Sequence, residues 1–165
     1  MFDFIDFNKV TSVKLSEDVD LSEFDCSLRD TLGLNEFIHK EAIEYQENDL
    51  GVTYLFYYEG VIIGYVTVAM SRLRGRLVPT EEDEKSIRWY PALLIGRIAV
   101  HNFCRDLDIG SYLCEWCVGY AQTLAEDIGC KFVYADTNDA VRGFYEKCGF
   151  VCIKEGDNIV AFRRI

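Results

Sequence analysis

The sequence has few of the features that would support export, membrane insertion or a linker. It contains only 2 prolines in 165 residues, and no Pro/Gly-rich or low-complexity stretch or repeat divides it. No run approaches the roughly 20 consecutive apolar residues that span a bilayer. The start, Met1-Phe-Asp-Phe-Ile-Asp-Phe, lacks the basic region of a signal peptide. We therefore expect one cytoplasmic domain over residues 1–165, with no membrane partner.

Basic residues are also scarce. The chain has 17 Lys and Arg against 28 Asp and Glu, a formal charge of −11, which argues against nucleic acid as a general partner. A local exception is Arg72-Leu-Arg-Gly-Arg76, followed by Arg88, Arg97 and Arg105, whereas acids gather at Glu81-Glu-Asp-Glu84. The arginine cluster is open to two interpretations, an ordinary solvated charge run or a patch that faces phosphate groups.

The cysteines form neither a disulfide framework nor a zinc site. Their number, 7, is odd, and most lie in apolar, regularly patterned segments. Cys114 and Cys117 make a C-x-x-C, but it falls inside a helical pattern without a second pair or a His cluster. We predict reduced, mostly buried thiols in a reducing compartment, and no metal.

Hydrophobic patterning predicts the α/β fold class. Val52–Tyr58 and Val61–Val68 read as a hairpin across Glu59-Gly60, and Ala92–Val100 reads as a central buried strand. Helical spacing covers Asn35–Tyr45, with Asn35 as the candidate cap, and Ile109–Ile128. The remaining predicted elements are a strand at Val10–Leu15, a short helix or turn at Phe24–Leu32, a loop at Pro79–Ser86, a strand at Lys131–Ala135, a helix at Ala140–Cys148 closed by Gly149, and a hairpin of Phe150–Lys154 with Ile159–Arg163. Together they predict a single three-layer αβα domain with a central mixed, largely antiparallel sheet.

The turn from Arg105 to Gly110 connects the predicted central strand to the long helix. A helix that starts directly after a buried strand presents unpaired N–H groups, with the positive end of its dipole behind them. Such a turn binds anions, and pyrophosphate is the usual one.

This turn resembles the pyrophosphate loop of the GNAT superfamily of N-acetyltransferases, Gln/Arg-x-x-Gly-x-Gly/Ala, with Arg105 at the first position and Gly110 at the last. A second, more specific match is Asn138-Asp-Ala-Val-Arg-Gly-Phe-Tyr-Glu-Lys-Cys-Gly-Phe150, which resembles the family's Asn-x-x-x-x-x-(Phe/Leu)-Tyr-x-x-x-Gly-Phe. The resemblance spans nearly the whole chain and implies the GNAT fold.

The resemblance also implies the site residues. Ile98 and Val100 would offer backbone groups to the pantetheine arm of acetyl-coenzyme A, Asn138 would steady the coenzyme, and Tyr145 would protonate the leaving thiolate. The alternatives are that Tyr145 is an aromatic anchor and Asn138 a plain helix cap. The implied coenzyme-binding set is Ile98, Ala99, Val100, Arg105, Asp106, Leu107, Asp108, Ile109, Gly110, Ser111 and Asn138.

Two loop positions depart from the family pattern. Asp108 stands at the fourth position, where the family has glycine, and Asp106 stands at a position where the family often has glycine. Each carboxylate near a pyrophosphate would cost on the order of 1 to 3 kcal/mol, about ten- to a hundredfold in affinity. Asp tolerates left-handed backbone, so the loop can still form. However, Asp108 could also cap its own helix and close the coenzyme site, which would leave a degenerate, non-catalytic binding module.

The general base is not assigned by sequence. His101, after the predicted strand, is the candidate because a neutral imidazole accepts a proton, although a solvated loop histidine is the alternative. Asp136 and Glu81 are weaker options, and an amine that arrives deprotonated needs no dedicated base.

The function implied is transfer of an acetyl group from acetyl-coenzyme A to a primary amine of a small molecule or protein. Phe24-Asp-Cys26, the helix 35–45 and the run Tyr90–Val100 look most like the branch that contains toxin-type acetyltransferases, which act on aminoacyl-tRNA. Binding of that substrate requires a broad basic surface, whereas this chain is strongly acidic and has only the Arg72–Arg76 cluster. The toxin function is therefore kept as the alternative. A homodimer is a further option, because exposed strand surface in this fold often pairs.

Overall fold

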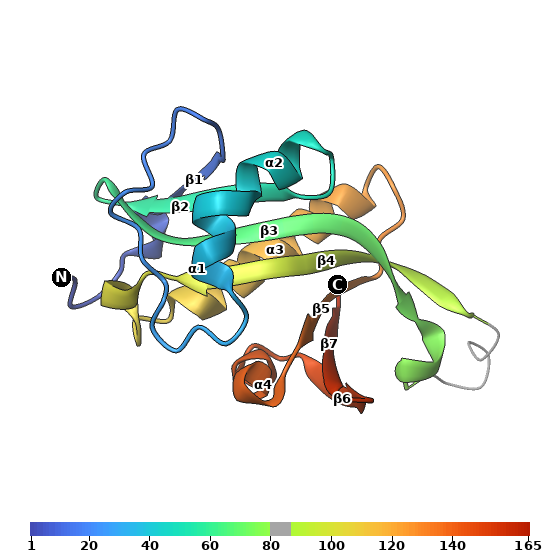
Figure 1. Ribbon diagram of the computed structural model, residues 1–165. Coiled ribbons are helices and arrows are strands. Elements are labelled where there is room, and N and C mark those ends of the chain that lie inside the picture. The colour runs from blue at the N-terminus through green and yellow to red at the C-terminus, as the bar shows by residue number, and fades with distance from the viewer. Residues whose placement is uncertain (80–86) are drawn as a thin grey trace. The chain divides into compact units, whose positions relative to one another are not determined.

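The computed structural model describes residues 1–79 and 87–165 (Figure 1). The predicted loop Pro79–Ser86 and the acidic run Glu81–Glu84 therefore lie outside the described residues, apart from Pro79. The strands are β1 (Thr11–Lys14), β2 (Val52–Tyr58), β3 (Val61–Arg74), β4 (Trp89–Val100), β5 (Phe132–Thr137), β6 (Val151–Glu155) and β7 (Asn158–Arg164). The helical elements are η1 (Phe7–Lys9), α1 (Leu34–Glu36), η2 (Phe37–Glu41), α2 (Ala42–Glu47), η3 (Gly75–Leu77), η5 (Asn102–Cys104), α3 (Ile109–Ala125) and α4 (Asp139–Lys147).

The strands form one 7-stranded sheet in the order β1-β2-β3-β4-β5-β7-β6. The β1–β2, β2–β3, β5–β7 and β6–β7 pairs are antiparallel, whereas β4 pairs with β5 in parallel. The predicted α/β class with a mixed, largely antiparallel sheet is confirmed. The chain divides into two compact units: one comprises Met1–Val68 and Gly96–Cys114, the other Ala69–Ile95 and Glu115–Ile165.

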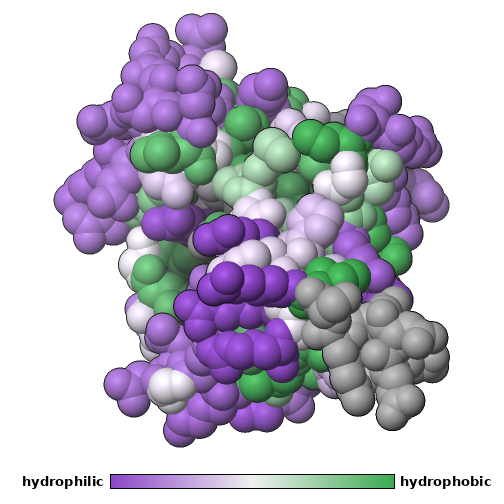
Figure 2. All heavy atoms as spheres, turned by 90° about the vertical axis from the view of Figure 1, so that its right-hand side faces the viewer, coloured by the Kyte–Doolittle hydropathy of each residue, from purple (hydrophilic) through white to green (hydrophobic). Residues whose placement is uncertain are grey.

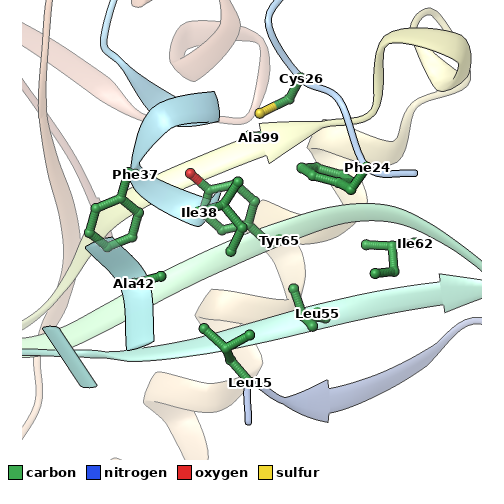
Figure 3. Packing of buried hydrophobic residues seen from close by; sticks show 10 residues of the cluster. All are labelled: Leu15, Phe24, Cys26, Phe37, Ile38, Ala42, Leu55, Ile62, Tyr65 and Ala99. Atoms are coloured by element: carbon green, nitrogen blue, oxygen red, sulfur yellow. The ribbon is translucent and has the colours of Figure 1, made fainter. Parts of the chain in front are cut away.

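In the first unit, the predicted hairpin of β2 and β3 is confirmed, and side chains cover both of its faces. Glu59 (φ 49°) and Gly60 (φ 77°) form the tight turn, in the left-handed backbone that such hairpins require. The paired residues Leu55 and Tyr65 lie in the core cluster under the helical segment 34–47 (Figure 3). Phe56, one residue along, makes an edge contact with Tyr112 of α3 instead. Helix, strand and helix therefore form three layers within this unit.

The helical segment in this unit differs from its prediction in two ways. In place of one continuous helix, the structure has three successive elements: α1, the π-helix η2 and α2. The Ala42 N–H donates to the Phe37 carbonyl and closes the π-turn. The cap assigned to Asn35 was wrong. The Asp30 carboxylate accepts from the backbone N–H groups of Leu34 (3.0 Å) and Asn35 (2.9 Å), while Asn35 Oδ1 accepts from the Cys26 N–H (3.0 Å). Residues 24–32 form turns and no helix.

In the second unit, the predicted hairpin of β6 and β7 is confirmed, β7 also pairs with β5, and α4 packs against β6 and β7. Gly149 (φ 82°) ends α4 in the left-handed conformation, as expected for a helix C-terminus. One face of the strands carries an apolar cluster: Leu73, Leu77, Val78, Tyr90, Ala92, Phe132, Tyr134, Val160 and Phe162. This unit positions the two motif residues Asn138 and Tyr145, at the start and on the interior side of α4.

All 7 cysteines are free thiols, and most are buried, as predicted. Cys114 and Cys117 are each 0% exposed, so the C-x-x-C is core packing. Burial raises the pKa of Cys117 to about 12, and burial together with the charges of Asp30 and Asp25 raises that of Cys26 to about 12. These two thiols therefore stay protonated and unreactive near neutral pH.

No helix in the described ranges is long and apolar enough to cross a bilayer.

Candidate functional site

Strand β4 presents different side chains on its two faces. Arg97 and Ala99 alternate with Ile98 and Val100, and Ala99 (7% exposed) belongs to the core cluster of the first unit. The parallel pairing with β5 covers only Ala92–Leu94, although β4 continues to Val100. The half-buried Ile98 and Val100 thus lie on a stretch of β4 beyond that pairing, where backbone groups can meet a ligand.

The predicted pyrophosphate loop is formed with both aspartates in left-handed backbone. Asp106 has φ 64° and Asp108 φ 61°, the region that glycine adopts at least cost. α3 begins at Ile109, and the Asp108 carbonyl accepts the first helical bond from the Tyr112 N–H at 3.1 Å. The N–H groups in the first turn of a helix have no intrahelical acceptor. The turn therefore forms with left-handed backbone at both aspartates directly before α3, and it carries two acidic side chains.

Arg105, the first residue of the loop, is fixed to the segment before α1. Its Nη1 donates to the Leu28 carbonyl at 3.2 Å. Nearby, the Leu28 N–H donates to Asn102 Oδ1 (2.9 Å), and the Asn102 N–H donates to the Asp25 carbonyl (2.8 Å). The loop and residues 25–28 are thereby joined by side-chain and backbone bonds, which hold the loop in one conformation.

His101 is a buried structural residue rather than a solvated one. It is 3% exposed, its Nδ1 accepts from the Phe103 N–H (3.1 Å), and its Nε2 faces the Glu23 carbonyl (2.9 Å). This pattern requires the neutral tautomer with the proton on Nε2. Both ring nitrogens are engaged with backbone groups, so the imidazole has no nitrogen left to receive a proton from an amine. The geometry argues against the base role predicted for His101.

Asn138 and Tyr145 lie in the second unit. Asn138 has extended backbone (φ −129°, ψ 174°), and its carbonyl accepts from the N–H groups of Val141 and Arg142 (3.1 Å each). Its side chain makes no cap hydrogen bond, so a plain side-chain cap does not explain this asparagine. Tyr145 is 4% exposed, with its ring against Phe150 at 5.3 Å between centroids. The ring therefore anchors α4, a role compatible with a hydroxyl that acts in chemistry.

Of the weaker base candidates, Glu81 lies outside the described residues, and Asp136 is on β5 two positions before Asn138. Partial desolvation, and then the negative charge of Glu155, raise the pKa of Asp136. A carboxylate with a raised pKa is a stronger proton acceptor, so Asp136 fits a base role better than His101 does. Within residues 1–79 and 87–165, no group of three His, Cys, Asp or Glu side chains could hold a metal ion.

The arginine cluster spans the end of β3 and the 3-10 turn η3 that follows it. Arg72, Arg74 and Arg76 are exposed and alternate with the buried Leu73, Gly75 and Leu77. The Arg72 guanidinium stacks 3.8 Å from the ring centre of Trp89, whereas Arg74 (3.1 Å) and Arg76 both donate to Glu155 Oε1. Figure 2 shows strongly hydrophilic side chains among apolar ones on the face that contains this end of β3. Glu155 is a neighbour that sequence reasoning missed, because 79 positions separate it from Arg76.

Arg97 is a second residue whose surroundings the sequence did not reveal. Its guanidinium lies 4.1 Å from the ring centre of Phe37 and 5.3 Å from that of Tyr45. The available signal was a charged residue inside the otherwise apolar run Leu93–Val100.

Comparisons with known proteins agree with the resemblance found in the sequence. The model of the acetyltransferase (GNAT) family matches residues 21–150. A search of curated proteins gives no match. Among solved structures, AtaT complexed with acetyl-methionyl-tRNAfMet is 21% identical, covers 92% of this chain and 93% of its own, and has a TM-score of 0.78.

Two further structures show the same fold at low identity. A mutant of the toxin AtaT, bound to the C-terminus of the antitoxin AtaR and acetyl-CoA, is 18% identical over 94% of this chain and 92% of its own, with a TM-score of 0.75. A KacT mutant is 16% identical over 94% and 95%, with a TM-score of 0.76. The family match covers most of the chain and includes both motifs up to Phe150. The chain therefore belongs to the GNAT acetyltransferase family, whose chemistry is acetyl-CoA-dependent acetylation.

Proposed function

We propose that this chain transfers the acetyl group of acetyl-coenzyme A to a primary amine of a small molecule or protein, and that residues 1–165 act as one domain. The observation that carries the proposal is the loop Arg105–Gly110, which keeps its left-handed positions at Asp106 and Asp108 and leads directly into α3. Family membership supplies the reaction class.

The proposed roles follow from the chemistry of thioester aminolysis. The loop N–H groups and the start of α3 would hold the pyrophosphate, and the backbone of Ile98 and Val100 the pantetheine arm. The amine nitrogen bonds to the carbonyl carbon, the C–S bond breaks, and the amine loses a proton to solvent or to a base such as Asp136. The Tyr145 hydroxyl would give its proton to the departing sulfur.

Coenzyme binding and turnover test the proposal separately. Acetyl-CoA should bind in calorimetry and stabilise the chain against thermal unfolding. In Tyr145→Phe, kcat should fall by about 10² or more, with little change in the affinity for acetyl-CoA. Tyr134→Phe is the matched control, because its hydroxyl bonds to Ser71 Oγ (2.7 Å) in the same unit and has no proposed role in the reaction. Absence of acetyl-CoA binding at millimolar concentration would refute the proposal.

A second candidate acceptor is aminoacyl-tRNA. The specific observation in its favour is the exposure of Arg72 and Arg74 at the end of β3 and of Arg76 in η3, since neighbouring exposed arginines suit a row of phosphates. The structural neighbours AtaT and KacT share the fold, and one AtaT structure contains acetyl-methionyl-tRNAfMet. Against this candidate stand the charge of −11 and the carboxylate of Glu155, which already binds two of the arginines.

Charged tRNA offered as acceptor distinguishes the two. If it is the substrate, mass spectrometry should detect an N-acetylated aminoacyl group, and replacing Arg72, Arg74 and Arg76 together by Gln should flatten the salt dependence of binding, by a log–log slope of about 2 to 3. A triple variant with the wild-type salt dependence would exclude the arginine cluster as a tRNA contact.

A further inference from the structure

Arg97 projects from β4, one residue before the stretch proposed to hold the pantetheine arm. It lies on the same face as Ala99, about 6.6 Å along the strand, and Ala99 packs in the cluster under the helical segment 34–47. Ile98 and Val100 alternate with it on the opposite face. Arg97 is therefore a cation close to the proposed reacting region, on the face of β4 that the helical segment covers.

Two aromatic rings hold the guanidinium in place. Its carbon lies 4.1 Å from the centre of the Phe37 ring and 5.3 Å from that of Tyr45, and Phe37 itself packs against Tyr45 at 5.5 Å. Stacking uses the flat face of a guanidinium and leaves the N–H groups at its edge available. Phe37 is 2% exposed and opens the π-helix η2, so the ring that carries the cation is fixed.

Arg97 has no acidic partner in the part of the chain that the structure describes. No ion pair joins it to a carboxylate in residues 1–79 or 87–165. Two acids of this unit, Asp25 and Asp30, are held by other groups: Asp30 accepts from Leu34 and Asn35, and Asp25 from the Ser27 N–H (2.9 Å). A half-buried arginine that is stacked but not ion-paired, in a chain with a charge of −11, retains its capacity to bind an anion.

We infer that Arg97 is an anion subsite for the acceptor, so that the preferred acceptor is an amine that carries a phosphate or carboxylate group. This inference rests on the proposed acetyltransferase function and specifies its substrate class. A planar guanidinium binds either oxyanion through two parallel N–H bonds, which fixes the orientation of the acceptor as well as its affinity. The anion is either part of a small molecule or a phosphate of an RNA end, and the same chemistry serves both.

The test compares paired amine acceptors of which one carries an anionic group and the other does not. Release of free coenzyme A thiol is followed with ethanolamine against phosphoethanolamine, with glycinamide against glycine, and with methionyl-tRNA. We expect kcat/KM to be at least tenfold higher for the anionic member of a pair. In Arg97→Met, which keeps an apolar chain against Phe37 and Tyr45, the KM for that member should rise at least tenfold, while the Kd for acetyl-CoA keeps its wild-type value. Arg97→Lys keeps the positive charge, so its KM for the anionic acceptor should rise less than that of Arg97→Met.

Arg164→Met is the control for a general loss of charge, because Arg164 also lies over an aromatic ring, that of Phe132 at 5.5 Å, but in the other unit. It should leave the preference for the anionic acceptor unchanged. Activity restricted to methionyl-tRNA, together with sensitivity to Arg97→Met, would assign the anion to RNA. Equal use of neutral and anionic amines, or an unchanged KM in Arg97→Met, would overturn the inference.

Direct binding decides the matter if none of these amines is acetylated. Inorganic phosphate is titrated by NMR into the protein saturated with acetyl-CoA, which occupies the loop. Millimolar phosphate binding that weakens at least fivefold in Arg97→Met supports the subsite, and equal or absent binding overturns it. Failure of acetyl-CoA itself to bind would refute the proposed function, and the phosphate titration of the unliganded wild type and Arg97→Met would still test Arg97.

Discussion

Asp30 Oδ2 accepts a hydrogen bond from the backbone N–H of Asn35 at 2.9 Å, while Asp30 Oδ1 accepts from the N–H of Leu34. The side chain that stabilises the start of the helical segment thus comes from the preceding turn, several positions before the helix. The helix start in turn sets Phe37, on which Arg97 stacks. A capping contact in the first unit therefore supports the proposed acceptor side of the site.

We predict that Asp30→Ala lowers the free energy of unfolding by about 1 to 2 kcal/mol, because two helix donors lose their acceptor. Urea denaturation at pH 7 measures the change. Asp30→Asn, which retains one acceptor oxygen, should cost less. Equal stability of wild type and Asp30→Ala would show that water replaces the cap.

The same residue predicts a dependence of stability on pH. Partial burial raises the pKa of Asp30. The backbone N–H groups of Asn35, Leu34, Leu32 and Gly33 lower this pKa by a larger amount together, so the net shift is downward. A lowered folded pKa gives stability that is complete above the unfolded pKa of about 3.9 and is lost as pH falls through the folded pKa. The stability difference between wild type and Asp30→Ala should be constant above about pH 5 and shrink below pH 4. A difference that does not change between pH 7 and pH 3 would contradict this cause.

Asp106 and Asp108 combine left-handed backbone with negative charge in the turn proposed to bind pyrophosphate. We expect Asp108→Gly, alone or with Asp106→Gly, to tighten acetyl-CoA binding about ten- to a hundredfold, because the repulsion between carboxylate and pyrophosphate is removed. Calorimetry measures the Kd. Asp108→Asn tests the charge alone, since it removes the charge but keeps a side chain that tolerates this backbone.

The outcomes distinguish a working coenzyme site from a degenerate one. If wild type fails to bind acetyl-CoA and Asp108→Gly gains binding, the loop is closed by its own aspartate and the chain is a binding module on the GNAT fold. If affinity is the same in all variants, neither the charge nor the backbone conformation limits the site.

His101 should matter for stability and not for proton transfer. Removing the imidazole in His101→Ala leaves the Phe103 N–H and the Glu23 carbonyl without their partners, which should cost about 2 kcal/mol or more in unfolding free energy. The pH profile of kcat/KM should keep its wild-type shape in the folded variant. Loss of the acidic limb of that profile, with a kcat lower by about 10² or more, would restore His101 as the base.

Gly64 of β3 lies close to the end of β4 that is proposed to hold the pantetheine arm. A Cβ placed there would lie 2.7 Å from the Ala99 carbonyl oxygen and 3.0 Å from Leu113 Cδ1. We predict that Gly64→Ala costs about 1 to 3 kcal/mol of stability, read as a lower Tm. Gly119→Ala is the matched control, because nothing lies within 4 Å of its Cβ in α3 and alanine favours helix. If Gly64→Ala is as stable as Gly119→Ala, β4 moves away from β3 at no measurable cost to make room for the added methyl group.

Much of the fold was accessible from sequence because its signals are local. Alternating and clustered apolar residues gave the hairpin of β2 and β3 with its Glu59-Gly60 turn, and helical spacing gave α3 and α4 to within a few residues. The loop Arg105–Gly110 and the Asn138–Phe150 motif gave the family, since both depend on residue types at fixed spacing along one stretch of chain.

The sequence by itself thus determined the fold class and the family, and it placed the turn proposed to bind the coenzyme directly before α3. Only the tertiary structure decided which side chains are free to act. His101 lost its candidacy because backbone groups from Glu23 and Phe103 occupy both nitrogens, and Glu23 lies 78 positions away. Arg97 is proposed as an anion subsite because the rings of Phe37 and Tyr45 lie against its guanidinium while no ion pair joins it to an acid within the described residues. Long-range packing fixes such contacts, and no local pattern of residues encodes them.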